Sequence, residues 1–567
     1  MVRRCSFLVV LALSCSKSDP PQEARPTAAP TPVPADTTSL GAATFAVSEG
    51  TPEARGHFAR GLLALHSFWY DEATRAFQQA VAADPTMKMA YWGAAMSSIK
   101  LLWGDDDLGA ARAVLARMPE PAKLTAREQA WVHAATELVA DGNVRSSRAR
   151  FLAAMETVHA KFPDDESATF LAIALVAATH PEDPDSVTVR KRAAGLAATV
   201  FEHNPDHPGA AHYAIHAYDT PELASLGLPY AKKYAQIAPA AFHARHMPAH
   251  IFSRLGMWKE AIASCRSAWD ASIGAATASK LSADHHDFHS LNWVIEMSFE
   301  LGLRKDADAA MKQFGEAVRA GLGRKTRTLY AVQVTSFMAR AGAWARLDEL
   351  LAPLESPAIG DPPGGAARDE PSHCAPTREA SPLELQEQMA VLNARARVAA
   401  AKRDVTGATK FLDQMEAVSA KIRPMLQATQ PPPMVAKFDE SNARRRASLL
   451  ARATGNDQAL LKILRESTAD ADRETGGEAN PSSFEVHEEI AETLMRLGQP
   501  KEAAAEYALA LAKHPRRARS TLGAARAATK LGDKPAALAR YTELAELWSG
   551  ADDGIDGLAE ARAAIKR

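Results

Sequence analysis

The sequence predicts an all-α protein, a helical solenoid of repeated helix pairs in two segments. Alanine is abundant, aromatic residues make up 6% of the 567 residues, and glycine and proline cluster in a few places. This composition favours helices joined by short turns. Small residues, an aromatic residue and a proline also recur along the chain in constant phase, which is typical of stacked helix pairs.

Residues 1–15, ahead of the helical region, have the pattern of a signal peptide. Arg3 and Arg4 precede an apolar run, and Ser14 stands before Cys15. The pattern resembles a bacterial lipoprotein signal, in which the cysteine is lipidated and becomes the new N-terminus. The alternative is an ordinary secretory signal with an incidental cysteine.

This segment predicts a location in the bacterial cell envelope. We expect an outer-membrane lipoprotein facing the periplasm, or alternatively a secreted or periplasmic soluble protein. No later stretch is apolar for long enough to span a bilayer, so a lipid anchor on Cys15 would be the sole membrane contact.

The rest of the chain divides by composition. Residues 16–48 are rich in proline, alanine and threonine and predict a disordered tether. Residues 49–354 predict an N-terminal helical array, and residues 383–567 predict a second one. Between them, residues 355–382 are rich in proline, glycine and charge, which is typical of a linker or long loop.

The repeat is clearest between Gly56 and Pro85. Small residues at Gly61 and Ala73 would let two helices approach closely, and Phe77 would lie on the inner face of the second helix. The spacing resembles the tetratricopeptide repeat, a helix–turn–helix unit of about 34 residues. It returns near the C-terminus as Ala503, Tyr507, Ala510 and Pro515.

Two histidine-containing blocks carry a closer resemblance. They read His-Pro-Gly-Ala-Ala-His-Tyr-Ala-Ile-His-Ala-Tyr-Asp from His207 and His-Met-Pro-Ala-His-Ile-Phe from His246. Over roughly residues 50 to 320 the chain resembles a group of bacterial tetratricopeptide proteins that are often exported and whose molecular function is poorly defined. The resemblance implies a tetratricopeptide fold and leaves the activity open.

Histidines are concentrated in this region, since ten of the eighteen fall between His203 and His289. Residues four apart on a helix share one face, and the first helix of each pair is expected to line the concave surface of a solenoid. We expect this concave surface to form a groove. Its candidate metal ligands are His212, His216, His246, His250 and His289. The candidate groove-binding residues beside them are Asp219, Arg254, Asn292, Trp293 and Glu296.

Three interpretations of the histidines compete. They could bind a divalent metal such as zinc, and a metal-dependent enzyme would then be possible. They could line a wet groove that recognises a protein or peptide partner. They could also be buried, hydrogen-bonded spacers between helices. The sequence favours an envelope-side scaffold that binds a protein or peptide. The alternative is a metal-binding protein or metal-dependent enzyme that uses the histidines of the groove.

Other function classes have no support in the sequence. The formal net charge is −2 with both signs interspersed, so no basic surface for nucleic acid is expected. We find no nucleophile arrangement, phosphate-binding glycine loop, dinucleotide fingerprint or CxxC motif, and no catalytic residue is predicted.

Overall fold

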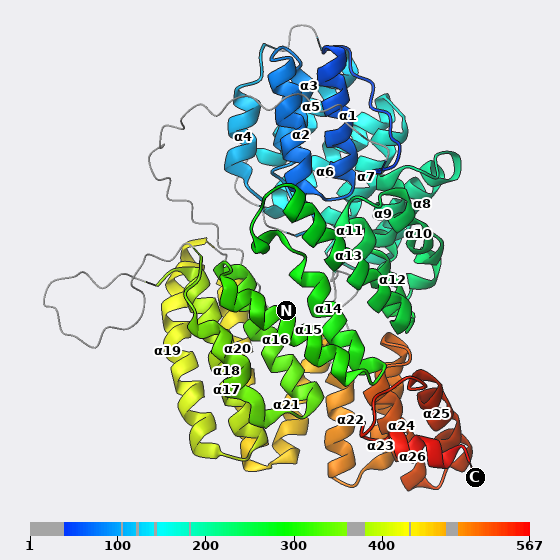
Figure 1. Ribbon diagram of the computed structural model, residues 1–567, viewed down its shortest axis with the longest axis vertical. Coiled ribbons are helices and arrows are strands. Elements are labelled where there is room, and N and C mark those ends of the chain that lie inside the picture. The colour runs from blue at the N-terminus through cyan, green and yellow to red at the C-terminus, as the bar shows by residue number, and fades with distance from the viewer. Residues whose placement is uncertain are drawn as a thin grey trace, which may run out of the picture. The chain divides into compact units, whose positions relative to one another are not determined.

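The computed structural model describes residues 39–103, 106–120, 124–140, 144–180, 183–359, 380–429, 432–471 and 486–566 (Figure 1). Within these ranges the regular elements are helices, which confirms the predicted all-α fold class. The described residues form two compact units. We call residues 39–252 the N-terminal unit and the described residues from 253 onward the C-terminal unit. In the described part of the chain, no helix has both the length and the apolar character needed to cross a membrane.

Helices of the N-terminal unit pack against their neighbours in sequence. They are α1 (Pro52–His66), α2 (Tyr70–Ala83), α3 (Lys88–Met96), α4 (Leu108–Ala116), α5 (Ala126–Val139), α6 (Val144–Lys161), α7 (Asp165–Ala178), α8 (Ser186–His203), α9 (Pro208–Tyr218), α10 (Ala224–Ile237), α11 (Phe242–His246) and α12 (Pro248–Arg254), within which the unit ends.

The C-terminal unit repeats the same arrangement of sequential helix pairs. Its helices are α13 (Trp258–Ala278), α14 (Phe288–Glu300), α15 (Arg304–Ala320), α16 (Arg324–Ala341), α17 (Leu347–Leu351), α18 (Pro382–Ala401), α19 (Val405–Thr429), α20 (Pro432–Thr454), α21 (Asp457–Ala471), α22 (Val486–Arg496), α23 (Pro500–Lys513), α24 (Ala518–Leu531), α25 (Lys534–Leu547) and α26 (Leu558–Ala564). Short 3₁₀ turns are η1 (Ala283–His285), η2 (Trp344–Arg346) and η3 (Ala352–Glu355).

Glycines allow the first helix pairs to pack as closely as the repeat requires. The Phe77 side chain on α2 is fully buried. A β-carbon added to Gly61 on α1 would lie 2.8 Å from its ring, and one added to Gly93 on α3 would lie 2.2 Å from it. In α24, a β-carbon on Gly523 would similarly lie 2.1 Å from the ring of Tyr507. The small-residue spacing read from the sequence therefore reflects tetratricopeptide-like packing in both units.

We expect Gly93→Ala to lower the free energy of unfolding by about 1–3 kcal/mol, because the added methyl group would overlap the enclosed ring of Phe77. Gly195→Ala is the matched control, since Gly195 lies on the exposed side of α8 with open space around its α-carbon. The control should raise the free energy of unfolding by roughly 0.5–1 kcal/mol through helix propensity. Urea unfolding of both variants measures these changes. Equal changes in the free energy of unfolding would contradict the close approach of Gly93 to the ring of Phe77.

The end of the predicted tether is part of the folded unit. The Phe45 side chain is buried, and its ring centroid lies 5.3 Å from that of Trp92 and 4.9 Å from that of Trp131. The Leu40 side chain is fully buried as well. Residues 39–48 of the segment predicted as a disordered tether are therefore packed into this unit. The remainder of that tether, the signal peptide and Cys15 lie outside the described residues.

The predicted linker does not separate the two units. Its central residues, 360–379, lie outside the described part of the chain. The helices on either side of it, α16 and α18, pack against each other, and a buried ion pair of 2.9 Å joins Arg327 to Glu387. The division between compact units follows Phe252 instead. The described residues on both sides of the predicted linker belong to one unit.

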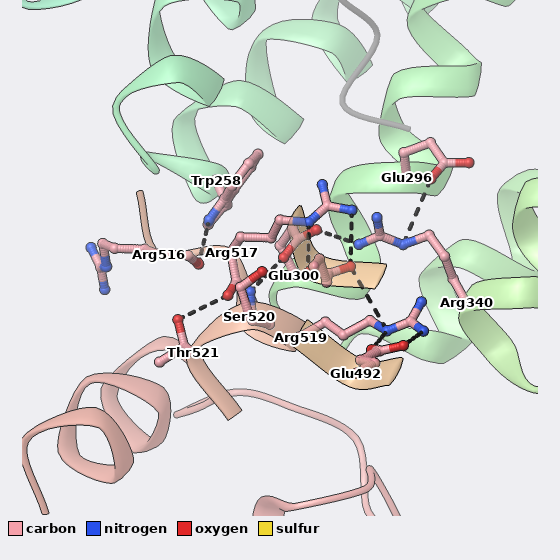
Figure 2. A network of polar contacts seen from close by, with 12 residues as sticks. Trp258, Glu296, Glu300, Arg340, Glu492, Arg516, Arg517, Arg519, Ser520 and Thr521 are labelled. Atoms are coloured by element: carbon pink, nitrogen blue, oxygen red, sulfur yellow. Dashed lines mark hydrogen bonds and ion pairs between the residues drawn. The ribbon is translucent and has the colours of Figure 1, made fainter. Parts of the chain in front are cut away.

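Buried charges hold the helices of the C-terminal unit together. Figure 2 shows Glu300 of α14 beside Arg340 of α16, and the other carboxylate oxygen of Glu300 accepts the Ala518 N–H at the start of α24 at 2.7 Å. Nearby, Nε of Arg517 donates to the buried carboxylate of Glu488 at 3.0 Å. A carboxylate at a helix N-terminus also compensates the positive end of the helix dipole.

Candidate metal centre

Three helices bring five histidines together in the interior of the N-terminal unit. Helix α9 carries His212 and His216 one turn apart, α11 carries His243 and His246, and α12 carries His250. The relative solvent-accessible area of each of these five residues is 6% or less. We call these residues the five-histidine cluster.

Prolines determine where two of these helices begin. Pro208 is the first residue of α9, and the ring of His207 caps that helix by accepting the Ala210 N–H at 3.2 Å. Pro248 is the first residue of α12, as its missing N–H predicts. The break between α11 and α12 therefore separates His246 from His250 while leaving both in the cluster.

The carbonyl oxygen of His66 fixes the tautomer of His212. A carbonyl oxygen can only accept, so Nδ1 of His212, 2.6 Å away, carries a proton and donates it. Nε2 of the neutral ring then has a single in-plane lone pair. Nε2 of His216 lies 3.0 Å from it and Nε2 of His243 lies 3.1 Å from it. One lone pair cannot accept two hydrogen bonds, so hydrogen bonding alone does not account for this convergence.

Burial keeps these rings neutral. It lowers the pKa of His212 to about 3. It also lowers the pKa of His216 far below the usual value, and the charges that His212 and His243 would carry add to this effect. Near pH 7 the rings are therefore in the neutral form that binds metals.

The remaining two histidines form a second convergent pair. Nε2 of His246 lies 3.1 Å from Nε2 of His250. Nδ1 of His250 lies 3.0 Å from a carboxylate oxygen of Asp219, which is itself buried. An ionised carboxylate can only accept, so Nδ1 of His250 is the donor, and in the neutral tautomer Nε2 is the nitrogen that carries the lone pair.

Aromatic rings enclose the cluster on one side. Phe68, in the turn between α1 and α2, has a positive φ of 51°, a conformation that costs energy for a bulky residue. Its ring centroid lies 4.4 Å from that of His212 and 5.5 Å from that of His243. The ring of Tyr234 stacks on His212 at 5.0 Å. The imidazoles therefore occupy a largely apolar pocket, in which their charged forms are disfavoured.

A second buried cluster adjoins the first through His66. Nε2 of His66 lies 2.8 Å from the carboxylate of Glu166, and Nε2 of His207 lies 3.5 Å from its other oxygen. The Tyr213 hydroxyl lies 3.0 Å from Nδ1 of His66. Burial would raise the pKa of Glu166, but the two imidazoles outweigh it and hold that pKa well below the usual range. Glu166 and Tyr213 thus hold the ring of His66 from both sides, whereas Nε2 of His207 and the Glu166 oxygen facing it have no hydrogen-bond partner among the described residues.

Within the N-terminal unit, the structure brings together His212, His216, His246 and His250, which were predicted as metal ligands, and adds His243. His243 was missed, although it stands three residues before His246 and so shares its face of α11. His289 lies at the start of α14 in the C-terminal unit. The structural roles of His66, Glu166 and His207 were also not predicted.

The predicted groove-binding residues are not exposed. Asp219, Arg254, Asn292, Trp293 and Glu296 are all buried. Asp219 orients His250, and Glu296 accepts a hydrogen bond from the Gln333 amide at 2.7 Å. These side chains therefore do not form the open, wet groove that the sequence predicted for direct contact with a peptide.

Comparisons with known proteins add information on the fold alone. No family model matches the chain, and no curated protein sequence matches it. Among solved structures, the Cut9–Hcn1 hetero-tetramer of the APC/C aligns over 84% of this chain and 76% of that chain, with 14% identity and a TM-score of 0.32. A human IFIT1 dimer with PPP-AAAA aligns over 81% and 90%, with 13% identity and a TM-score of 0.33. The P58(IPK) TPR domain aligns over 85% and 99%, with 13% identity and a TM-score of 0.19. Likeness at this level carries no inference about a ligand or partner.

Proposed function

We propose that this protein binds a divalent transition-metal ion through Nε2 of His212, His216 and His243. The observation that carries the proposal is the approach of two further ring nitrogens, at 3.0 and 3.1 Å, to the single lone pair of His212. A cation at this position accepts all three lone pairs at once, which no pattern of hydrogen bonds achieves.

The distances and the donor set support this assignment. Zinc–imidazole bonds of about 2.0–2.1 Å in a tetrahedral site place the nitrogens roughly 3.3 Å apart. The nitrogens in the cluster lie slightly closer than this. Imidazole suits Zn²⁺, Cu²⁺ and Ni²⁺ among the available ions. The hydrogen bond from Nδ1 of His212 to the His66 carbonyl is the kind of contact that orients a metal-binding histidine.

Three imidazoles are fewer ligands than a closed structural zinc site uses, and they are the number found in sites that keep a position for water or substrate. The centre could therefore bind a further small ligand. No acid or base from the N-terminal unit is assigned a catalytic role, so the proposal is metal binding rather than a named reaction.

The metal content of the purified full chain tests this proposal. After incubation with Zn²⁺ and dialysis, the wild-type protein should retain zinc, and His216→Ala should retain less of it because this site has lost one of its three ligands. His133→Ala is the matched control, since His133 is an exposed histidine of the same unit. A wild-type protein that retains no zinc, or equal retention by the two variants, would overturn the proposal.

Binding of a protein or peptide partner stays a second proposal. Arrays of helix pairs present extended surfaces to partner segments, which supports it. The buried residues named in the sequence prediction cannot supply the contacts, so a partner would have to use another surface. Attachment to the envelope through Cys15 is likewise still a prediction.

A further inference from the structure

The five-histidine cluster contains more ligands than one ion requires. His212, His216 and His243 supply the site proposed above, and His246 and His250 then remain, with their Nε2 atoms 3.1 Å apart. That separation matches the 3.0 and 3.1 Å of the first site. In both pairs of histidines that are four residues apart, one on α9 and one across α11 and α12, the two Nε2 atoms therefore approach each other in the same way.

The pair His246 and His250 has a built support of its own. A buried carboxylate oxygen of Asp219 lies 3.0 Å from Nδ1 of His250. A carboxylate that accepts the Nδ1–H of a histidine fixes its orientation and makes the other nitrogen a stronger ligand. This carboxylate–histidine contact is separate from the His66 carbonyl that orients His212, so each set of ligands has its own orienting group.

The two sets of ligands lie side by side. The ring centroids of His243 and His246 are 6.1 Å apart, and those of His216 and His250 are 6.4 Å apart. Helix α11 contributes one ligand to each set from consecutive turns. A second ion at His246 and His250 would thus be a near neighbour of the first, inside one enclosure of imidazole and aromatic rings.

We propose that the N-terminal unit binds two divalent ions as a paired centre, the second held by Nε2 of His246 and His250 with Asp219 as its positioning residue. The inference rests on the proposed function, because it assumes that the first ion binds at His212, His216 and His243. Paired metal ions bind and polarise oxygen ligands between them, so the chemical class of ligand expected here is water or a small oxyanion.

The test is the number of ions bound by the full chain, measured by titration with Zn²⁺ and by elemental analysis at saturation. We expect two ions per wild-type chain and one per His250→Ala chain, with the remaining ion bound as tightly as the first ion of the wild type. Asp219→Asn should still bind two ions, with the affinity for one of them lowered about 10- to 100-fold. His133→Ala, the exposed control, should match the wild type.

Other outcomes separate the two proposals. One ion per wild-type chain, lost in His216→Ala and unchanged in His250→Ala, would overturn the second site and leave the first intact. Loss of all metal in a folded His250→Ala protein would indicate a single mixed site and also overturn the paired centre. Absence of metal from the wild type would overturn both proposals. If circular dichroism shows that His250→Ala does not fold, the affinities of Asp219→Asn for its two zinc ions test the second site instead. Two affinities equal to those of the wild type would contradict the role of Asp219.

Discussion

Saturation with Zn²⁺ is expected to raise the free energy of unfolding of the N-terminal unit by about 4 kcal/mol when free metal exceeds its dissociation constant about 1000-fold. The ion would link α9 to α11, whose ligands converge only in the folded chain, so it binds the native state and not the unfolded one. Thermal unfolding of the full chain, with Zn²⁺ and with a chelator, measures the difference.

His216→Ala provides the critical comparison. It removes the ion at His212, His216 and His243, so the gain in its free energy of unfolding between chelator and Zn²⁺ should be smaller than that of the wild type, while His133→Ala should keep the full metal-dependent gain. Hydrogen exchange of peptides from α9 and α11 would assign the effect to the N-terminal unit. An equal gain in His216→Ala would show that zinc stabilises the protein from some other site.

Glu488→Gln is expected to lower the free energy of unfolding of the C-terminal unit by about 3–5 kcal/mol, because it removes the buried negative charge that pairs with the guanidinium of Arg517. Urea unfolding followed by circular dichroism measures the loss, and hydrogen exchange of α22 and α24 assigns it. The control is Glu316→Gln, which removes an exposed carboxylate 3.8 Å from Lys312 and should change stability by less than about 1 kcal/mol. A loss below about 1 kcal/mol in Glu488→Gln would contradict the role of this pair.

The same carboxylate predicts a dependence on pH. Burial would raise the pKa of Glu488, but Arg517 and Arg519 outweigh it and lower that pKa to about 2, from an ordinary value of 4.5. The unfolded chain therefore takes up a proton at higher pH than the folded chain does. The stability that Glu488 contributes is present above about pH 4.5 and is lost as the pH falls towards 2. Glu488→Gln should lack this part of the acid sensitivity.

The repeat could be predicted from the sequence because its determinants are local. Gly61, Phe77 and Gly93 lie within one stretch of chain, and each occupies a fixed position of the repeat. Composition could not show that α16 and α18 pack against each other, because Arg327 and Glu387 are 60 residues apart in sequence. The buried side chains of Leu40 and Phe45, which pack residues 39–48 into the unit, are equally invisible in an average over a proline-rich segment.

The candidate site was predicted in part for the same reason. Histidines four apart on one helix are recognisable in the sequence, and His212, His216, His246 and His250 were identified that way. His243 is a ligand candidate because α11 packs so that its ring meets His212, 31 residues earlier in the chain. The rule that first helices face the concave side of a solenoid does not say whether such a face is open, and Asn292 and Glu296 are buried.

The group that orients His212 belongs to the main chain, since the acceptor is the carbonyl oxygen of His66 at the end of α1. An alanine scan of the protein would leave that oxygen in place at every position and would therefore overlook it. Only a change in the path of the backbone, such as an insertion in the turn that holds Phe68, can withdraw it. A change in the length of this turn would thus alter the affinity of the proposed metal site while every histidine is retained.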